Sequence, residues 1–133
     1  MTEFIPHLPK EEVERISAVG LAHVGDAVYE LLVRGSLCAR GHLAVQDLHR
    51  STVAYVKAPA QAEAAARLLP LLSEEEQAVY RRARNAKTHA APQGASVGEY
   101  HAATALEALF GWLYLLGRTE RIEELFALAV EVK

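Results

Sequence analysis

Apolar residues recur every three or four positions along almost the whole chain, which is the spacing of one face of a helix. No convincing segment alternates apolar and polar residues with the two-residue period of a strand. The pattern therefore predicts an all-α domain, a bundle of six to seven helices. Residues 21–39 are apolar around nearly their whole circumference, which is typical of a helix at the centre of a bundle. Residues 102–117 are also expected to form a buried helix.

Local signals predict where the helices begin and end. A short first helix is expected near Pro9, with Val13 and Ile16 facing inward. Capping boxes are predicted at Ser73–Glu76 and Ser96–Glu99, where a serine and a glutamate satisfy free backbone donors. The other expected helices cover about 43–56, 59–69, 74–87 and a last helix capped by Thr119. In residues 43–56, the expected inward positions are Val45, Leu48, Thr52 and Val56.

Composition narrows the class of protein. A chain of 133 residues is long enough for one domain, expected to span residues 1–133. Its hydrophobic fraction of 51% excludes a disordered tail, and a single cysteine excludes an internal disulfide. The N-terminus lacks an apolar signal core, and residues 102–117 are too short for a membrane span. We therefore expect a cytoplasmic protein with no membrane partner.

Two carboxylates stand in the segments expected to be buried. Asp26 lies in the first, and Glu107 is the only charged side chain between residues 102 and 117. Burial of an unpaired carboxylate costs several kcal/mol, so each needs a compensating partner. The partner could be a backbone group or an arginine, or the two acids could form a dyad for acid–base chemistry. Facing helices could instead hold Mg²⁺, which prefers oxygen ligands and can activate water beside a phosphodiester.

Basic residues gather just ahead of a loop predicted at residues 88–98. The net charge of −3 argues against nucleic-acid binding by bulk charge, but it leaves room for a local basic patch. Such a patch fits a surface that contacts phosphates, although a solvated helix face is an equal alternative. The candidate phosphate-contacting residues are Arg81, Arg82, Arg84, Asn85, Lys87 and, from a looser second group, Arg50.

Several ordered motifs resemble the ribonuclease III domain. Residues 21–28 (LAHVGDAV) resemble its signature helix, and residues 107–111 (EALFG) resemble its second acidic motif. The compact branch called Mini-ribonuclease III, which lacks a double-stranded-RNA-binding domain, is the more similar group. Three further stretches carry that similarity: 25–30, 84–87, and Thr104 near Tyr100. The resemblance extends from about residue 18 to residue 116.

This resemblance implies a homodimeric, all-helical endonuclease that cleaves double-stranded RNA with Mg²⁺. It implies that Asp26 and Glu107 are the catalytic, metal-binding acids. The compact branch is linked to maturation of large-subunit (23S) ribosomal RNA, so a ribosomal RNA precursor is the expected substrate. Without a separate duplex-binding domain, an accessory ribosomal protein could present the RNA. Independently, the helix at 21–33 is apolar on more faces than a small bundle covers, which also favours a dimer unless flanking helices cover it.

The sequence also departs from the larger enzymes of the family. Val19, Ala22 and Thr104 stand where those enzymes have further acids, so two motif acids remain. This departure favours an alternative, a non-catalytic RNA-binding or ribosome-assembly module on the same fold. A third interpretation is a helical interaction domain in which the acids are structural. Glu30, one turn beyond Asp26, is expected to form an ion pair or an interface contact.

Overall fold

The chain folds into α-helices. The computed structural model describes residues 2–86 and 94–133, and within these ranges it contains seven α-helices, one short 3-10 helix and no strand. The all-α prediction is therefore confirmed. The elements are α1 (Lys10–Glu14), α2 (Ala18–Ala39), α3 (Val45–Val56), α4 (Ala58–Leu68), η1 (Leu69–Leu71), α5 (Glu74–Arg84), α6 (Val97–Leu115) and α7 (Thr119–Ala129).

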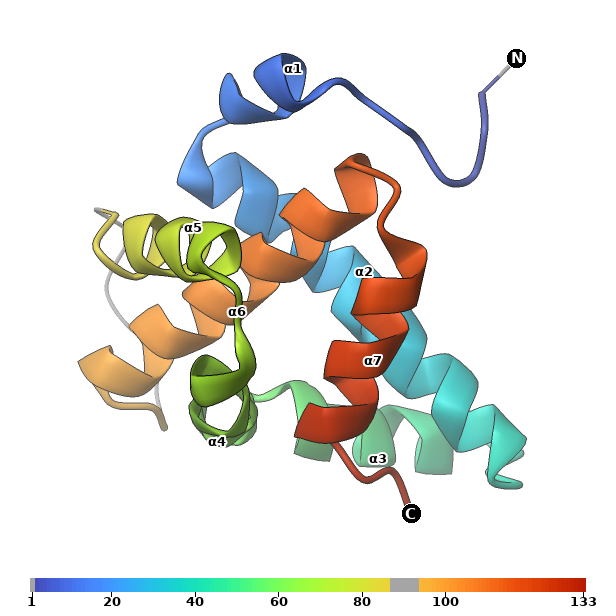
Figure 1. Cartoon of the computed structure of the whole chain (residues 1–133). Helices are drawn as coiled ribbons and strands as arrows, with labels where there is room; N and C mark the ends of the chain where they lie inside the picture. Colours follow the sequence, from blue (N-terminus) through green and yellow to red (C-terminus); the bar gives the residue numbers. More distant parts are fainter. Residues whose placement is uncertain (1, 87–93) are drawn as a thin grey trace.

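Helices α2 and α6 cross at the centre of the molecule (Figure 1). Helix α6 also packs against α4, α5 and α7, while α3 packs against α2 and α4. Such a central position requires an apolar surface on nearly every side, and α6 is buried almost continuously from Ala103 to Leu113. Glu107 is the exception in this stretch, because it is half-buried.

Glycine makes the close crossing of α2 and α6 possible. A Cβ atom built on Gly25 would lie 1.6 Å from the carbonyl oxygen of Glu107. A Cβ atom on Gly111 would lie 2.1 Å from the carbonyl oxygen of Leu21. No side chain fits at either distance, so the two backbones are in direct contact. This contact brings the chain on either side of Gly25 next to Glu107.

The local signals in the sequence located most helix starts correctly. Both capping boxes are present, with reciprocal hydrogen bonds between Ser73 and Glu76 and between Ser96 and Glu99. Two details were wrong. Thr119 is the first helical residue of α7 rather than its cap, and the preceding residue makes no side-chain cap bond. Val45, the first residue of α3, is 78% exposed instead of facing inward.

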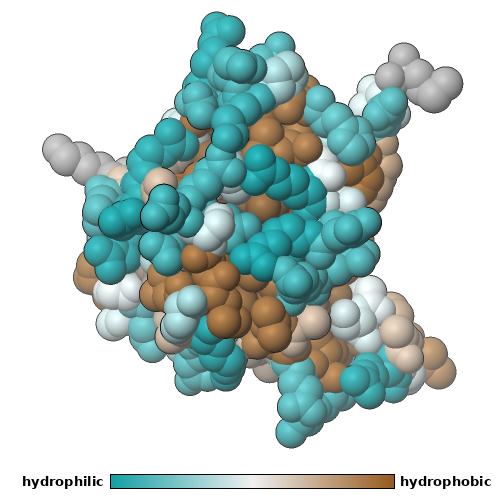
Figure 2. All heavy atoms as spheres, in the orientation of Figure 1, coloured by the Kyte–Doolittle hydropathy of each residue, from teal (hydrophilic) through white to brown (hydrophobic). Residues whose placement is uncertain are grey.

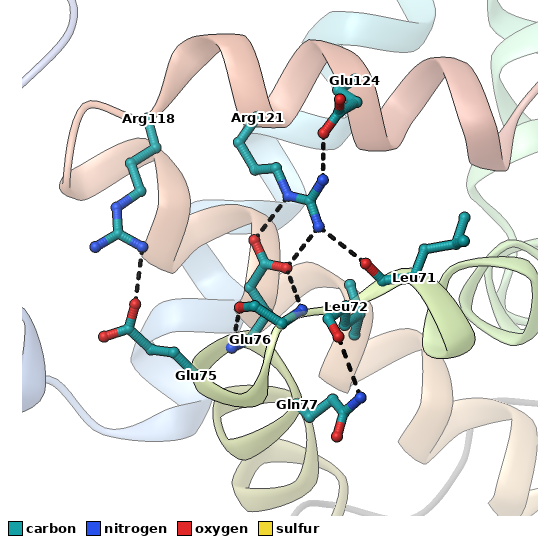
Figure 3. Close-up of polar contacts among 9 residues, drawn as sticks. Leu71, Leu72, Glu75, Glu76, Gln77, Arg118, Arg121 and Glu124 are labelled. Atoms are coloured by element: carbon teal, nitrogen blue, oxygen red, sulfur yellow. Dashed lines mark hydrogen bonds and ion pairs between the residues drawn. The ribbon is translucent and has the colours of Figure 1, made fainter.

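An ionic contact joins α5 to α7 (Figure 3). Arg121 donates Nε and Nη2 to the two carboxylate oxygens of Glu76, each at 2.8 Å. The same guanidinium also contacts Glu124 and the carbonyl oxygen of Leu71. Glu76 is only 4% exposed, and these hydrogen bonds from Arg121 hold its pKa below the usual range. The pair fixes the first turn of α5 and with it the direction in which the basic end of α5 points.

On the face drawn in Figure 2, hydrophilic side chains cover much of the region of α5 and α7, and a hydrophobic patch lies below them. Across residues 2–86 and 94–133, we find no helix with both the length and the apolar character needed to cross a membrane.

Candidate active site

Asp26 lies on the surface, which corrects the expectation that it is buried. The buried positions of α2 form a stripe that runs through Leu21, Gly25, Tyr29 and Val33 against the rest of the bundle. Asp26 follows Gly25 and is therefore turned by about 100° from the centre of that stripe. It stands at the edge of the α2–α6 crossing, where solvent and a large substrate can reach its carboxylate.

Glu107 faces this exposed carboxylate from α6. Desolvation, together with the charge of Asp26 and a side-chain hydrogen bond to it, raises the pKa of Glu107 from 4.5 to about 8. The crossing therefore does bring the two predicted acids together, although they are 81 positions apart in the sequence (107 − 26). Two like charges so close favour either a shared proton or a bound cation.

Gln61 of α4 also contacts Glu107, and the sequence analysis missed it. Its Nε2 atom donates to Glu107 Oε2 over 3.4 Å, and the side chain is only 2% exposed. The position of Gln61 in the helix pattern could have identified it from the sequence. Gln61 shares one face of α4 with the buried residues Ala64, Ala65 and Leu68, so it is a polar side chain on an otherwise apolar face.

Glu30 has the role expected of it. Its Oε2 atom accepts a hydrogen bond from Arg34 Nη2 at 2.6 Å, an ion pair between successive turns of α2. The negative charge of Glu30 adds a smaller contribution to the raised pKa of Glu107.

The acids lack basic partners in the part of the chain that the structure describes. There, neither Asp26 nor Glu107 lies within ion-pair distance of a lysine, arginine or histidine. Nor does that part hold a cluster of three or more histidine, cysteine, aspartate or glutamate side chains suited to a metal ion. Two facing carboxylates still suit a hard divalent cation, because it relieves their repulsion and takes waters or phosphate oxygens as further ligands.

The predicted basic residues lie on two helices. Arg81, Arg82 and Arg84 are exposed in the last turn of α5, and Asn85 is the exposed residue that ends this helix. Arg50 is exposed on α3, with its Nη2 atom 4.0 Å from Asp47 Oδ1. Lys87 lies outside the described residues. The arginines of α5 form no ion pair with any described residue, so their charges are available to a ligand.

A separate cleft of about 950 Å³ lies where α2, α3, α4 and α7 meet the C-terminal segment. Its lining includes Tyr29 and Arg67 but neither candidate acid. The buried Tyr29 hydroxyl has no hydrogen-bond partner among the described residues, and burial raises its pKa. The cleft is thus distinct from the paired carboxylates.

The helical fold agrees with a comparison against known families. The model of the ribonuclease III domain matches residues 20–118, which include most of α2 with Asp26 and all of α6 with Glu107. The chain belongs to the ribonuclease III domain family.

Individual relatives narrow this assignment to Mini-ribonuclease 3. The protein of that name from Thermoanaerobacter sp. (strain X514) is 47% identical over 125 residues, covering 94% of this chain and 88% of the relative. The Mini-ribonuclease 3 of Symbiobacterium thermophilum is 50% identical over 111 residues, covering 84% and 85%. The crystal structure of protein FN1578 from Fusobacterium nucleatum superimposes with a TM-score of 0.79 at 32% identity, covering 86% of this chain and 93% of that one. Within its family the chain falls in the Mini-ribonuclease 3 group.

Membership of this family defines the general activity. The protein is an endoribonuclease of the ribonuclease III type, a hydrolase of phosphodiester bonds in RNA. The family acts on double-stranded RNA and generally uses a divalent metal ion.

Proposed function

We propose that this protein cleaves double-stranded RNA with Mg²⁺, and that Asp26 and Glu107 are its catalytic, metal-binding acids. The observation that carries the proposal is the pairing of these carboxylates across the α2–α6 crossing without a basic partner among the described residues. A structural role for the acids predicts such a basic partner or a backbone bond. A nuclease site instead predicts two carboxylates that helix packing holds close together and whose repulsion is relieved when a cation binds.

The two acids have different tasks in this proposal. Asp26 is exposed and meets the substrate from the solvent side, while Glu107 is half-buried and fixed by the helices around it. When bound, the cation supplies charge neutralisation at the scissile phosphate and activates the attacking water. The rigid contact of Gly25 and Gly111 with the facing backbone holds the two carboxylates at a set separation. Preorganised groups of this kind lose little energy to rearrangement during the reaction.

RNA binding is assigned to Arg81, Arg82, Arg84, Asn85, Lys87 and Arg50. The three arginines of α5 are exposed and unpaired among the described residues, which suits contacts with backbone phosphates. The side-chain amide of Asn85 suits hydrogen bonds to sugar or phosphate. A-form RNA is recognised mainly through its shape and its 2′-hydroxyls, so we expect weak sequence preference.

A homodimer completes the proposal. Leu31 on α2 is 56% exposed and Val19 on the same helix is 47% exposed, so the flanking helices leave part of α2 uncovered. Exposed apolar side chains on the central helix suit burial against a second copy. Two copies would supply two sites, one for each strand of the duplex.

We expect the substrate to be a precursor of large-subunit (23S) ribosomal RNA. We expect the protein to act in the cytoplasm with Mg²⁺ as its cofactor. An accessory ribosomal protein could present this RNA, and residues 1–133 would act as a single catalytic domain. The relatives named Mini-ribonuclease 3 support the choice of a compact nuclease over a larger enzyme.

The direct test is incubation of the purified protein with a long RNA duplex in Mg²⁺ or in EDTA. The proposal predicts cleavage products in Mg²⁺ and none in EDTA. Since only two motif acids are present, binding without cleavage in either buffer would favour the alternative of a non-catalytic RNA-binding module. If the duplex were not bound at all, the acids would be structural parts of an interaction domain.

A further inference from the structure

Gln61 occupies an unusual position for a glutamine. It is 2% exposed, and its Nε2 atom donates to Glu107 Oε2 over 3.4 Å. Burial of an amide costs free energy unless the amide is hydrogen-bonded, so a buried glutamine needs a specific partner. Here the partner is one of the two candidate metal-binding acids, on a different helix and 46 positions away.

The placement of Gln61 follows from the way α4 begins. Pro59 stands in the first turn of α4, where its missing N–H group costs nothing, and Lys57 ahead of the helix is extended. Ala64, Ala65 and Leu68 then pack the same face of α4 against the bundle, and α4 is in contact with α6 along this face. The small alanine side chains bring α4 close to α6, so the amide of Gln61 reaches Glu107.

We propose that Gln61 is a positioning residue of the metal site, which holds the Glu107 carboxylate in the orientation that binds the cation together with Asp26. This inference rests on the proposed function. The terminal torsion of a glutamate is broad, and a carboxylate beside Asp26 gains by rotating away from it. A donor that engages Oε2 opposes this rotation and leaves the other carboxylate oxygen free to face Asp26.

The chemistry of the amide fits this role better than that of a charged residue. A lysine or arginine at position 61 would neutralise Glu107 and repel an incoming cation. A neutral amide donates a hydrogen bond without adding charge, so the two acids keep their attraction for a divalent ion. Groups that orient metal ligands in this way typically change metal affinity roughly 10- to 100-fold when removed.

The test measures metal binding directly, with Mn²⁺ as a paramagnetic probe titrated into the metal-free protein and followed by electron paramagnetic resonance. Gln61→Met keeps the length of the side chain but removes the donor, and we expect it to bind Mn²⁺ roughly 10- to 100-fold more weakly than wild type. The Mg²⁺ concentration that half-saturates RNA cleavage should rise by a similar factor, while the rate at saturating Mg²⁺ stays within a few-fold of wild type. Gln46→Met, at an exposed position of α3, is the matched control and should change neither quantity.

A second variant keeps the test decisive if Gln61→Met does not fold. Gln61→Asn keeps a polar amide but is one carbon shorter, so its donor should no longer reach Glu107 and Mn²⁺ binding should weaken as in Gln61→Met. The inference fails if either folded variant binds Mn²⁺ like wild type. These results are distinct from failure of the proposed function, in which the wild-type protein itself would show neither Mn²⁺ binding nor cleavage.

Discussion

Gly25 of α2 lies directly against the backbone of Glu107 of α6, so closely that a Cβ atom on Gly25 would be 1.6 Å from the Glu107 carbonyl oxygen. One contact thus couples the packing of the two central helices to the placement of both candidate catalytic acids. Asp26 follows this glycine in the chain, and Glu107 provides the surface against which the glycine packs.

Replacing Gly25 by alanine should force α2 and α6 apart. We expect Gly25→Ala to lower the free energy of unfolding by about 3 kcal/mol, at the upper end of the cost of overpacking, because the obstructing atoms are backbone. The measurement is urea denaturation followed by circular dichroism. Gly35→Ala on the same helix is the control, since a Cβ atom on Gly35 would meet nothing within 4 Å. It should stabilise the helix by roughly 0.5–1 kcal/mol. Equal effects of the two substitutions would disprove the close crossing.

The raised pKa of Glu107 makes the stability of the metal-free protein depend on pH. Between its usual value of 4.5 and about 8, the folded protein keeps the proton that the unfolded chain releases, so this group destabilises the fold as pH rises. Glu107→Gln has no carboxyl to titrate at this position, so it does not lose stability in this way. In EDTA, the free energy of unfolding of Glu107→Gln minus that of wild type should increase by about 2 kcal/mol from pH 5 to pH 8.5. This value is discounted for the partial exposure of the carboxyl.

A second group with a raised pKa, His42, must be separated from Glu107. Hydrogen bonds to the Lys133 carbonyl oxygen and to Asp47 raise the pKa of His42 above 6.5. The stability that His42 contributes is present in full below pH 6.5 and is lost as pH rises through its folded-state value. Because wild type and Glu107→Gln share His42, it cancels in their difference. A difference that stays constant with pH would contradict the account of Glu107.

The contact between Arg121 and Glu76 should be a major source of stability. Arg121→Met would leave the carboxylate of Glu76, which is 4% exposed, buried without its cation. The loss of one partner from such a pair costs about 3 kcal/mol, whereas an exposed pair contributes less than about 1 kcal/mol. Arg34→Met, which breaks the more exposed pair with Glu30, is the control. Thermal unfolding should separate the two variants clearly, and similar melting temperatures would show that the α5–α7 contact is unimportant.

The exposed part of α2 predicts the effect of a charge on assembly. Wild type should elute with about twice the chain mass of 14.5 kDa in size-exclusion chromatography with light scattering. Leu31→Asp should shift this to the monomer mass, because a buried unpaired carboxylate would oppose the interface. Val97→Asp, at the 63% exposed start of α6, should stay dimeric. A dimer that survives Leu31→Asp unchanged would place the interface elsewhere.

Periodicity and capping signals predicted the helical fold well, because both depend on residues close in the sequence. The two capping boxes and the central apolar helices follow directly from local patterns. The exposure of Asp26 could not be predicted in this way, since it depends on where α6 crosses α2 and which side of α2 stays open. Gln61 was missed for the same reason: its partner Glu107 lies on another helix. Val45 shows the opposite error, in which an apolar residue at helical spacing remains at the surface.

The most direct test of the account is the rate at which Asp26→Asn cleaves a long RNA duplex in Mg²⁺, measured beside its melting temperature and its affinity for the same RNA. We predict that cleavage falls by roughly 100-fold or more, since loss of a metal ligand removes several kcal/mol of transition-state stabilisation. Folding and RNA binding should remain close to wild type because Asp26 is exposed. Glu30→Gln, one turn away, should keep most of the activity. Cleavage by Asp26→Asn at a rate near that of wild type would contradict the assignment of the active site.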